Sequence, residues 1–221
     1  MNPVERLEEI RSKIPSDIKV VAVSKTKPAT MIEDLYLKSG HKIFGENRVQ
    51  ELESKHVVLP NDIEWHLIGH LQTNKVKFVV PYIGMIQSVD SLKLLNEINS
   101  EAAKKNRVIP CLLQFHIAEE DSKFGFSMDE ACAMLDKELI YQFNNVEIKG
   151  VMGIATYTSD LKKIQSEFRT LYKTYDYLRK TYFSASPGFR EISMGMTNDY
   201  QLAVEEGSTI LRIGSGIFGE R

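Results

Sequence analysis

Short apolar runs alternate with longer segments of helical periodicity along the chain. The first run, residues 20–23, is unbroken and lies between polar residues, which is typical of a strand buried on both faces of a parallel sheet. Residues 29–39 then repeat apolar side chains at helical spacing and end at Gly40, a residue suited to the position just after a helix. The pattern predicts a strand followed by a helix.

The same unit recurs to the end of the chain, after an initial helix predicted at 4–13. We expect strands at 20–23, 42–47 (with its loop), 63–69, 83–88, 108–115, 146–154, 190–193 and 209–213. We expect the helices between them at 29–39, 46–56, 73–79, 91–103, 127–142, 159–182 and 197–205. Pro110 has no amide hydrogen, so the paired part of the fifth strand is expected to begin after it.

Strand and helix alternate eight times without a change of composition. This alternation predicts an α/β fold with one domain over residues 1–221, a (β/α)8 TIM barrel preceded by a helix. A doubly wound open sheet is the competing architecture. No glycine fingerprint follows the first strand, which disfavours a dinucleotide-binding version of that sheet.

Charge and composition narrow the classes of partner. Lys and Arg number 28 against 30 Asp and Glu, a net charge of −2, which disfavours a nucleic-acid or anionic-membrane surface. No apolar run approaches the roughly 20 residues of a membrane helix, and the N-terminus lacks the features of a signal peptide. Only Cys111 and Cys132 occur, without metal-ligand spacing, so we expect a cytoplasmic protein without a metal site. With no obvious interface stripe, we expect a monomer.

Lys25 follows the first strand directly, where a barrel places its chemistry. Pro28 then ends the strand. In a partly apolar pocket the neutral, nucleophilic amine is favoured over the ammonium, and its expected use is a Schiff base with an aldehyde. Local sequence alone is explained more simply by a solvated lysine at a strand end.

The last two strands are followed by segments suited to phosphate. Gly214, Ser215 and Gly216 form a glycine-rich turn whose amide and hydroxyl groups suit a phosphate. Thr197 is expected at the start of a helix, an end that favours anions. Either segment alone is also typical of an ordinary turn or cap. Together with Lys25 they suit an aldehyde that carries a phosphate: pyridoxal 5′-phosphate (PLP) or, in an aldolase-like barrel, a sugar phosphate.

Four motifs in fixed order resemble the YggS/PROSC family of pyridoxal phosphate homeostasis (PLP-binding) proteins, and the resemblance extends from about residue 4 to the C-terminus. They are residues 23–28 (VSKTKP), 44–51 (FGENRVQE), 65–75 (WHLIGHLQTNK) and 193–199 (SMGMTND). The family is similar to the N-terminal barrel of alanine racemase, the fold-type III class of PLP proteins. The chain departs from it at His70, often proline in the family, and at Thr73 and Thr197, often serine.

The resemblance implies roles for individual residues. Lys25 would carry PLP as an internal aldimine, and Arg212 would face the pyridine nitrogen. Thr197, Gly214 and Ser215 would bind the phosphate. A guanidinium donates to the ring nitrogen and keeps it unprotonated, which makes the ring a poorer electron sink.

Other polar residues near strand ends fit more than one place. Asn47 and Ser193 are assigned to the cofactor, although Asn47 would equally well cap the next helix. His66 is expected in an inward polar layer and His70 at the rim. Ser88 and Gln114 fit either the barrel mouth or that layer.

The resemblance favours a carrier over an enzyme. The chain is expected to hold PLP in the cell, to act in PLP homeostasis and to deliver the cofactor transiently to PLP-dependent apo-enzymes, without strong catalysis. The alternative is an amino-acid racemase-like enzyme. Racemases of this fold take a second acid/base, a tyrosine, from an added β-domain and a partner subunit, and this sequence ends at Arg221, directly after the phosphate segment.

Overall fold

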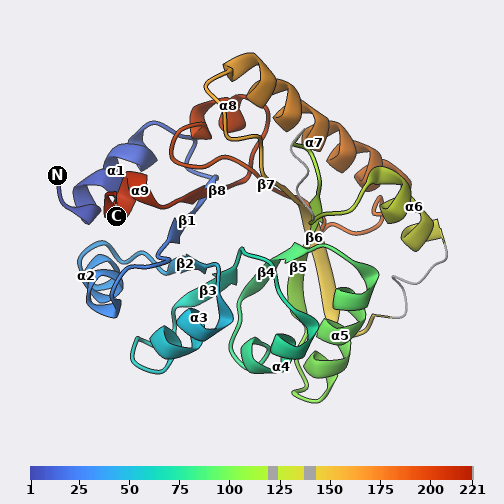
Figure 1. The fold of residues 1–221 in the computed structure, drawn as a ribbon, viewed down its shortest axis with the longest axis horizontal. Coiled ribbons are helices and arrows are strands. Elements are labelled where there is room, and N and C mark those ends of the chain that lie inside the picture. The colour runs from blue at the N-terminus through green and yellow to red at the C-terminus, as the bar shows by residue number, and fades with distance from the viewer. Residues whose placement is uncertain (119–123, 137–142, 221) are drawn as a thin grey trace.

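A computed structural model describes residues 1–118, 124–136 and 143–220. Eight parallel strands form a closed barrel in sequence order, with helices around it (Figure 1). The predicted (β/α)8 fold is thereby confirmed. The strands are β1 (Lys19–Val23), β2 (Ile43–Glu46), β3 (Glu64–Leu67), β4 (Met85–Val89), β5 (Ile109–Phe115), β6 (Val146–Gly153), β7 (Glu191–Ser193) and β8 (Ile210–Ile213).

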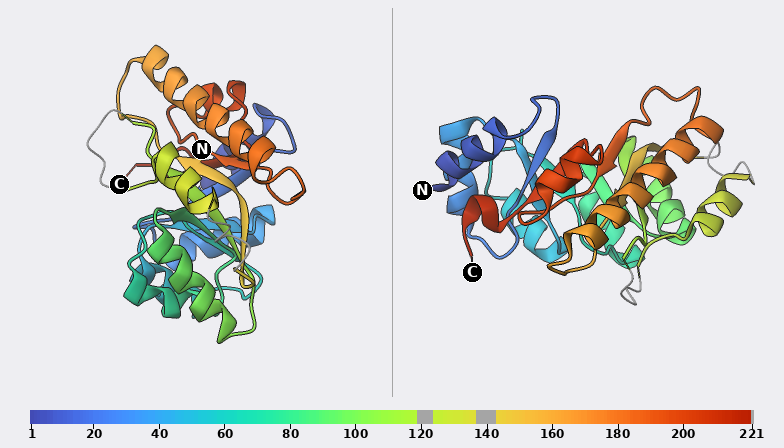
Figure 2. Two further views of the ribbon diagram at one scale, coloured as in Figure 1. Left: turned by 90° about the vertical axis from the view of Figure 1, so that its right-hand side faces the viewer. Right: turned by 90° about the horizontal axis from the view of Figure 1, so that it is seen from above.

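Helices α1 (Pro3–Ser12) and α9 (Ser215–Phe218) pack together, so the two ends of the chain lie side by side (Figures 1 and 2). The other helices cover the barrel between strands. They are α2 (Ala29–Ser39), α3 (Val49–His56), η1 (Thr73–Lys75), α4 (Val76–Val79), α5 (Leu92–Ala103), α6 (Met128–Asp136), α7 (Leu161–Thr181) and α8 (Tyr200–Glu205).

Two apolar layers hold the barrel. The larger lies between the strands and the surrounding helices, and α7 contributes Ile164, Phe168 and Leu171 to it from one face. The smaller fills the barrel interior, with one apolar residue from each of five strands. These are Val21, Met85, Leu112, Met152 and Ile210. Strands buried on both faces explain the unbroken apolar runs of the sequence.

Several predicted boundaries were wrong. Helix α3 begins at Val49 and not at residue 46, because Glu46 completes β2 with a buried side chain. Strand β5 is already paired at Pro110, which lies opposite Glu147 of β6. The Ile109 N–H donates to the Asn145 carbonyl, which precedes β6. Backbone groups of successive strand residues point to opposite neighbours, so those of residue 110 point toward β4. The pairing of β4 with β5 begins only at Cys111. The missing amide hydrogen therefore costs no ladder bond.

Two further differences lie near the C-terminus and in the middle of the chain. Helix α8 begins at Tyr200, so Thr197 lies in the preceding loop and not at a helix start. The glycine-rich segment after β8 contains α9, which the sequence did not indicate. Helix α6 is described to Asp136, and the rest of the predicted helix, 137–142, lies outside the described residues.

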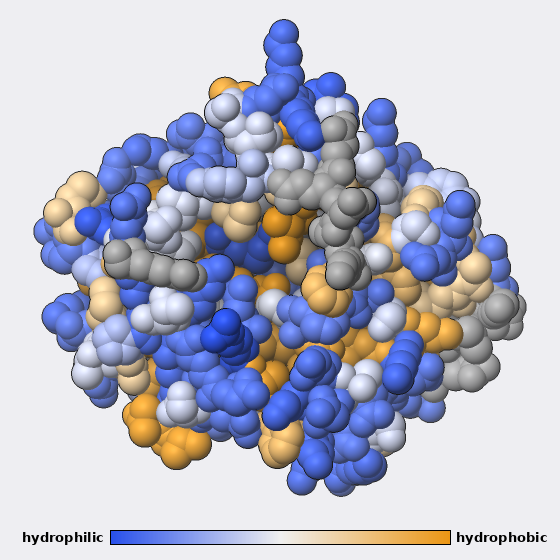
Figure 3. Space-filling view, in the orientation of Figure 1, coloured by the Kyte–Doolittle hydropathy of each residue, from blue (hydrophilic) through white to orange (hydrophobic). Residues whose placement is uncertain are grey.

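Hydrophilic side chains dominate the face shown in Figure 3, with apolar patches scattered among them. Within the described part of the chain, no helix has both the length and the apolar character to cross a membrane.

Candidate functional site

A cavity of about 980 Å³ opens among the loops that follow the strands of the barrel. Residues from the segments after β1, β2, β3, β6, β7 and β8 contribute to its wall. Polar lining residues are Lys25, Asn47, Thr156, Tyr157, Thr158, Ser159, Thr197, Asn198, Asp199, Arg212 and Ser215. Six of the seven residues assigned to the cofactor from sequence therefore line one cavity; the seventh, Ser193, lies beneath it.

Lys25 lies in the turn between β1 and α2, half-buried at the cavity wall. Within the described part of the chain, no hydrogen bond or ion pair engages its Nζ atom. The adjoining residues, in contrast, are held. The Ser24 N–H donates to the Gly45 carbonyl at 3.0 Å, and the Lys27 Nζ donates to the Gly219 carbonyl at 3.0 Å. A fixed turn thus presents a free amine to the cavity.

Arg212 lies in β8, and only 4% of its surface is exposed. Its Nη1 donates to the Ser193 hydroxyl at 2.6 Å and its Nη2 to the Gly153 carbonyl at 2.8 Å. Burial lowers the pKa of the guanidinium to about 10, so the group remains charged at neutral pH. Each terminal nitrogen carries a second N–H, which leaves donors for a ligand in the cavity.

A chain of buried hydrogen bonds continues from Arg212 through the barrel. The Ser193 hydroxyl donates to the Gln87 side-chain oxygen at 2.6 Å, and the Gln87 amide nitrogen donates to Nδ1 of His66 at 2.8 Å. Nε2 of His66 then donates to Glu64 at 2.9 Å. Because guanidinium only donates, Arg212 fixes the direction of every later bond and thereby the His66 tautomer. Ser193 acts on the cavity through Arg212.

Thr197 and the start of α9 form the candidate phosphate site. The Thr197 hydroxyl accepts the Gly216 N–H at 3.1 Å and the Ser215 hydroxyl at 3.3 Å. At Gly216 an added Cβ would lie 3.0 Å from Ile213 and 3.1 Å from Thr197, so a side chain there would push these two neighbours back by a few tenths of an ångström. At Gly214 an added Cβ would be in ordinary contact, 3.4 Å from the Val23 carbonyl. Through its bonds to Ser215 and Gly216, Thr197 contacts the start of α9 and does not begin α8.

Asn47 does not cap the helix that follows it. The residue before α3 is Arg48, and its side chain makes no capping bond. Asn47 instead lines the cavity, and its Oδ1 atom is buried without a hydrogen-bond partner among the described residues. A buried acceptor without a partner is costly, so this atom is available to a donor that enters the cavity.

Sequence reasoning missed other parts of the cavity. Asp199 lines it, its Oδ1 accepts the Met196 N–H, and burial raises the pKa of its carboxyl. The loop from β6 to α7 adds Thr156, held by Glu167, and the exposed Tyr157. Asp199 lies two residues after Thr197, and no sequence motif marked it as a separate site residue. The β6–α7 loop carries no glycine motif.

The remaining polar residues lie away from this cavity. The Ser88 hydroxyl donates to the Gly69 carbonyl at 2.6 Å, and the Gln114 amide donates to the Phe124 carbonyl at 3.5 Å. His66 belongs to the interior hydrogen-bond chain. Among the described residues no group of three His, Cys, Asp or Glu side chains has the arrangement of a metal site.

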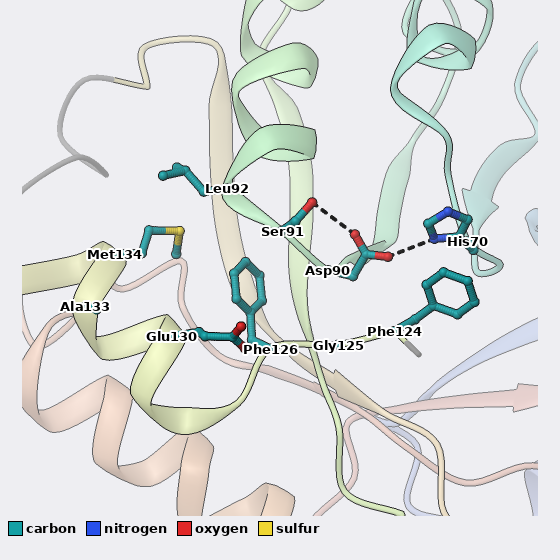
Figure 4. A pocket seen from close by; sticks show the side chains of 10 residues that line it. All are labelled: His70, Asp90, Ser91, Leu92, Phe124, Gly125, Phe126, Glu130, Ala133 and Met134. Carbon is teal, nitrogen blue, oxygen red and sulfur yellow. Dashed lines mark hydrogen bonds and ion pairs between the residues drawn. The ribbon is translucent and has the colours of Figure 1, made fainter. Parts of the chain in front are cut away.

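A second cavity, of about 600 Å³, lies beside the loops after β3 and β4 (Figure 4). His70 stacks on Phe124, and its Nδ1 bonds to the Asp90 carboxylate at 2.8 Å. Asp90 and Glu130 are its acidic lining residues, and among the described residues no lysine or arginine lines it. Two carboxylates against one histidine make the described lining acidic, which disfavours a phosphorylated ligand.

Comparisons with known proteins identify the family. Residues 4–221 match the family described as alanine racemase, N-terminal domain. The pyridoxal phosphate homeostasis protein of Aquifex aeolicus (strain VF5) is 36% identical over 232 residues, covering 100% of this chain and 99% of that protein. The chain belongs to the pyridoxal phosphate homeostasis protein family. The resemblance found in the sequence motifs is thereby confirmed.

Solved structures place this family member in the same fold. The structure of PipY from Synechococcus elongatus PCC7942 with PLP bound has a TM-score of 0.88 at 34% identity and covers 99% of this chain and 100% of that chain. Alanine racemase of Clostridium difficile 630 has a TM-score of 0.75 at 14% identity, with 100% of this chain matching 56% of that chain. The likeness to alanine racemase shows the fold alone.

Proposed function

We propose that this member of the pyridoxal phosphate homeostasis family binds PLP as a Schiff base on Lys25 and acts in intracellular PLP homeostasis and cofactor delivery, without strong catalytic activity of its own. Lys25 would supply the amine that condenses with the aldehyde, and the aldehyde oxygen would leave as water. PLP-dependent apo-enzymes would take the cofactor through transient contacts. The chain would act in the cytoplasm as a monomer.

One observation carries the proposal: an amine without a partner shares a cavity with groups that complement the rest of PLP. Lys25 suits the aldehyde, and the hydroxyls of Thr197 and Ser215 suit the phosphate. Arg212 retains N–H groups for the pyridine nitrogen. The buried oxygen of Asn47 needs a donor, and a hydroxyl on the ring would supply one. The PipY neighbour, solved with PLP bound, supports the same ligand.

The test is spectroscopic and chemical. Purified protein mixed with PLP should develop an absorbance band at the edge of the visible region, which borohydride reduction abolishes. Mass spectrometry of the reduced protein should place the pyridoxyl group on Lys25. Lys25→Ala should lose the band and keep its fold by circular dichroism, whereas Lys75→Ala should behave as wild type. An adduct on Lys27 or Lys75, or none, would refute the proposal and return the sugar-phosphate alternative to consideration.

A racemase-like activity is the second candidate, and one observation bears on it. Tyr157 lines the cavity, and a phenol there is chemically suited to donate a proton. Its side chain is 89% exposed, however, so its position is not fixed by packing. A fixed second acid/base is what racemisation needs, and the exposure of Tyr157 therefore favours the carrier.

A further inference from the structure

Lys55 is a buried ammonium on α3, only 5% exposed. Its Nζ donates to the Ser24 carbonyl at 2.8 Å and to carboxylate oxygens of Glu46 and Glu51, each at 2.7 Å. All three N–H groups of the ammonium are therefore used. Burying such a group in ion pairs stabilises a fold little or not at all compared with an apolar residue of the same size. Stability alone does not explain this cluster.

The cluster holds the chain on both sides of Lys25. On the N-terminal side, the Ser24 hydroxyl donates to Oε1 of Glu46 at 2.6 Å, the same oxygen that Lys55 contacts. On the C-terminal side, the Thr26 N–H donates to Oε1 of Glu51 at 2.5 Å. The residue between them makes no such bond. A rigid frame thus surrounds a free side chain.

Thr26 shows that this frame holds the chain against a local preference. Its φ is +65°, in the left-handed region that a β-branched residue rarely adopts. Such a conformation is strained and persists only where surrounding contacts determine it. Here the Glu51 carboxylate holds the Thr26 amide, and Lys55 in turn holds that carboxylate.

We propose that Lys55, Glu46 and Glu51 are positioning residues that set the turn carrying Lys25, and thereby aim its amine into the cavity. They contact neither the amine nor the cavity and act through the backbone at Ser24 and Thr26. The expected consequence for PLP capture rests on the proposed function. The consequence for the turn itself does not.

Four variants separate this role from a general effect on the fold. Glu51→Ala removes the acceptor for the Thr26 amide, and Lys55→Met removes the ammonium at similar volume. Glu51→Gln keeps an acceptor oxygen at the same place. Glu53→Ala, on the same helix and without a bond to the turn, is the matched control.

The first readout uses protein without PLP. Hydrogen–deuterium exchange followed by mass spectrometry should show faster exchange in the peptide spanning 24–27 for Glu51→Ala and Lys55→Met. Glu53→Ala should match wild type. The second readout is the rate at which PLP becomes trapped on Lys25 by borohydride. A misaimed nucleophile should slow this rate by about tenfold to a hundredfold. Glu51→Gln should lie nearer to wild type than Glu51→Ala in both measurements.

The two proposals fail in different ways. Without a Lys25 adduct in wild type the proposed function fails, and exchange still decides the role of the cluster. If wild type captures PLP while Glu51→Ala equals Glu53→Ala in exchange and in rate, the positioning role is refuted. If Lys55→Met does not fold, Glu51→Ala carries the test, because the Glu51 side chain is already 23% exposed.

Discussion

At the scale of single residues, the candidate site depends on which groups are occupied and which are free. Arg212 and Ser193 are occupied by bonds that run into the barrel, whereas Lys25 and the Asn47 oxygen have no partner among the described residues. Occupied groups keep their positions, and free groups are available to a ligand. This division separates the support of the site from its reactive and binding atoms.

The hydroxyls of Thr197 and Ser215 provide a prediction about the phosphate. Thr197→Val removes one donor without changing side-chain shape, and Ser215→Ala removes the other. A hydrogen bond to a charged group contributes about 1.5–3 kcal/mol, and since Ser215 is exposed we expect the lower end, about a tenfold weaker affinity for PLP per substitution. Equilibrium dialysis measures the dissociation constant directly.

Pyridoxal, which has no phosphate, is the control ligand for that measurement. Both variants should bind it as wild type does, and Thr170→Val on the outer helix α7 should bind PLP normally. Equal losses for PLP and pyridoxal would show a damaged cavity. Unchanged PLP affinity in the double variant would place the phosphate elsewhere.

The sequence predicted where the site lies, but it did not show all of the residues and contacts that form it. Lys25 and Thr197 were found because the carboxyl ends of parallel strands meet at one face of a barrel, whereas Arg212 was assigned through the family resemblance. The unpaired oxygen of Asn47 and the cluster around Lys55 arise from packing between segments that are distant in the sequence. No residue spacing in the sequence indicates that packing. Asp199 was missed for the same reason. The roles of the seven assigned residues remain predictions.

At the scale of elements, the hydrophobic pattern located every strand. The first and last residues of the elements depended on tertiary contacts, which the pattern does not show. Glu46 reads as the first residue of a helix, yet its side chain is buried with Ser24 and Lys55, which keeps it in β2. Pro110 lies in a strand because β4 has not yet begun to pair there. Element ends are thus decided by neighbouring elements.

The docking of α1 yields a prediction about pH. His41, just before β2, accepts a bond from Arg11 of α1 at Nδ1 and donates from Nε2 to the Ile43 carbonyl. Burial, and then the charge of Arg11, lower the pKa of His41 from 6.5 to about 4. Between these values the unfolded chain binds a proton that the folded chain does not, so stability falls as pH falls through this window. The loss approaches about 3 kcal/mol.

Urea unfolding between pH 7 and pH 4 tests this coupling. Wild type should lose more free energy of unfolding over that range than His41→Gln, which is less stable at pH 7 but has no imidazole to protonate. Other acidic groups titrate in both proteins, so the difference between the two curves isolates His41. Parallel curves would show that His41 does not resist protonation in the fold.

At the scale of the whole molecule, two separate groups of bonds support the candidate site. The hydrogen-bond chain from Arg212 runs through the interior to Glu64, which lines a cavity near α1 on the other side of the barrel. The frame around Lys25 lies instead between the barrel and α3. Apart from Arg212, the residues that make these bonds do not line the Lys25 cavity, so that cavity is left to a ligand, as the proposed carrier requires.

This arrangement predicts very little racemisation. Moving a proton from one face of an amino acid to the other needs a positioned group on each side, and one such group contributes about 10²–10⁴-fold in rate. The titratable side chains of the described cavity are Lys25, Tyr157, Asp199 and Arg212. Arg212 and Asp199 are engaged by other bonds, and Tyr157 is exposed, so Lys25 alone is placed to move a proton.

The protein loaded with PLP is therefore expected to exchange α-hydrogen and racemise L-alanine no more than a few-fold faster than the same concentration of free PLP. The measurement is incubation in deuterated water, with chiral chromatography and α-deuterium content followed over time, and repeated with other L-amino acids. Tyr157→Phe should change neither rate. Turnover at ordinary enzyme rates that disappears in Lys25→Ala would overturn the carrier proposal. If Tyr157→Phe also abolished that turnover, Tyr157 would be identified as the second acid/base, because its exposed phenol would then have to move into the cavity when the substrate binds.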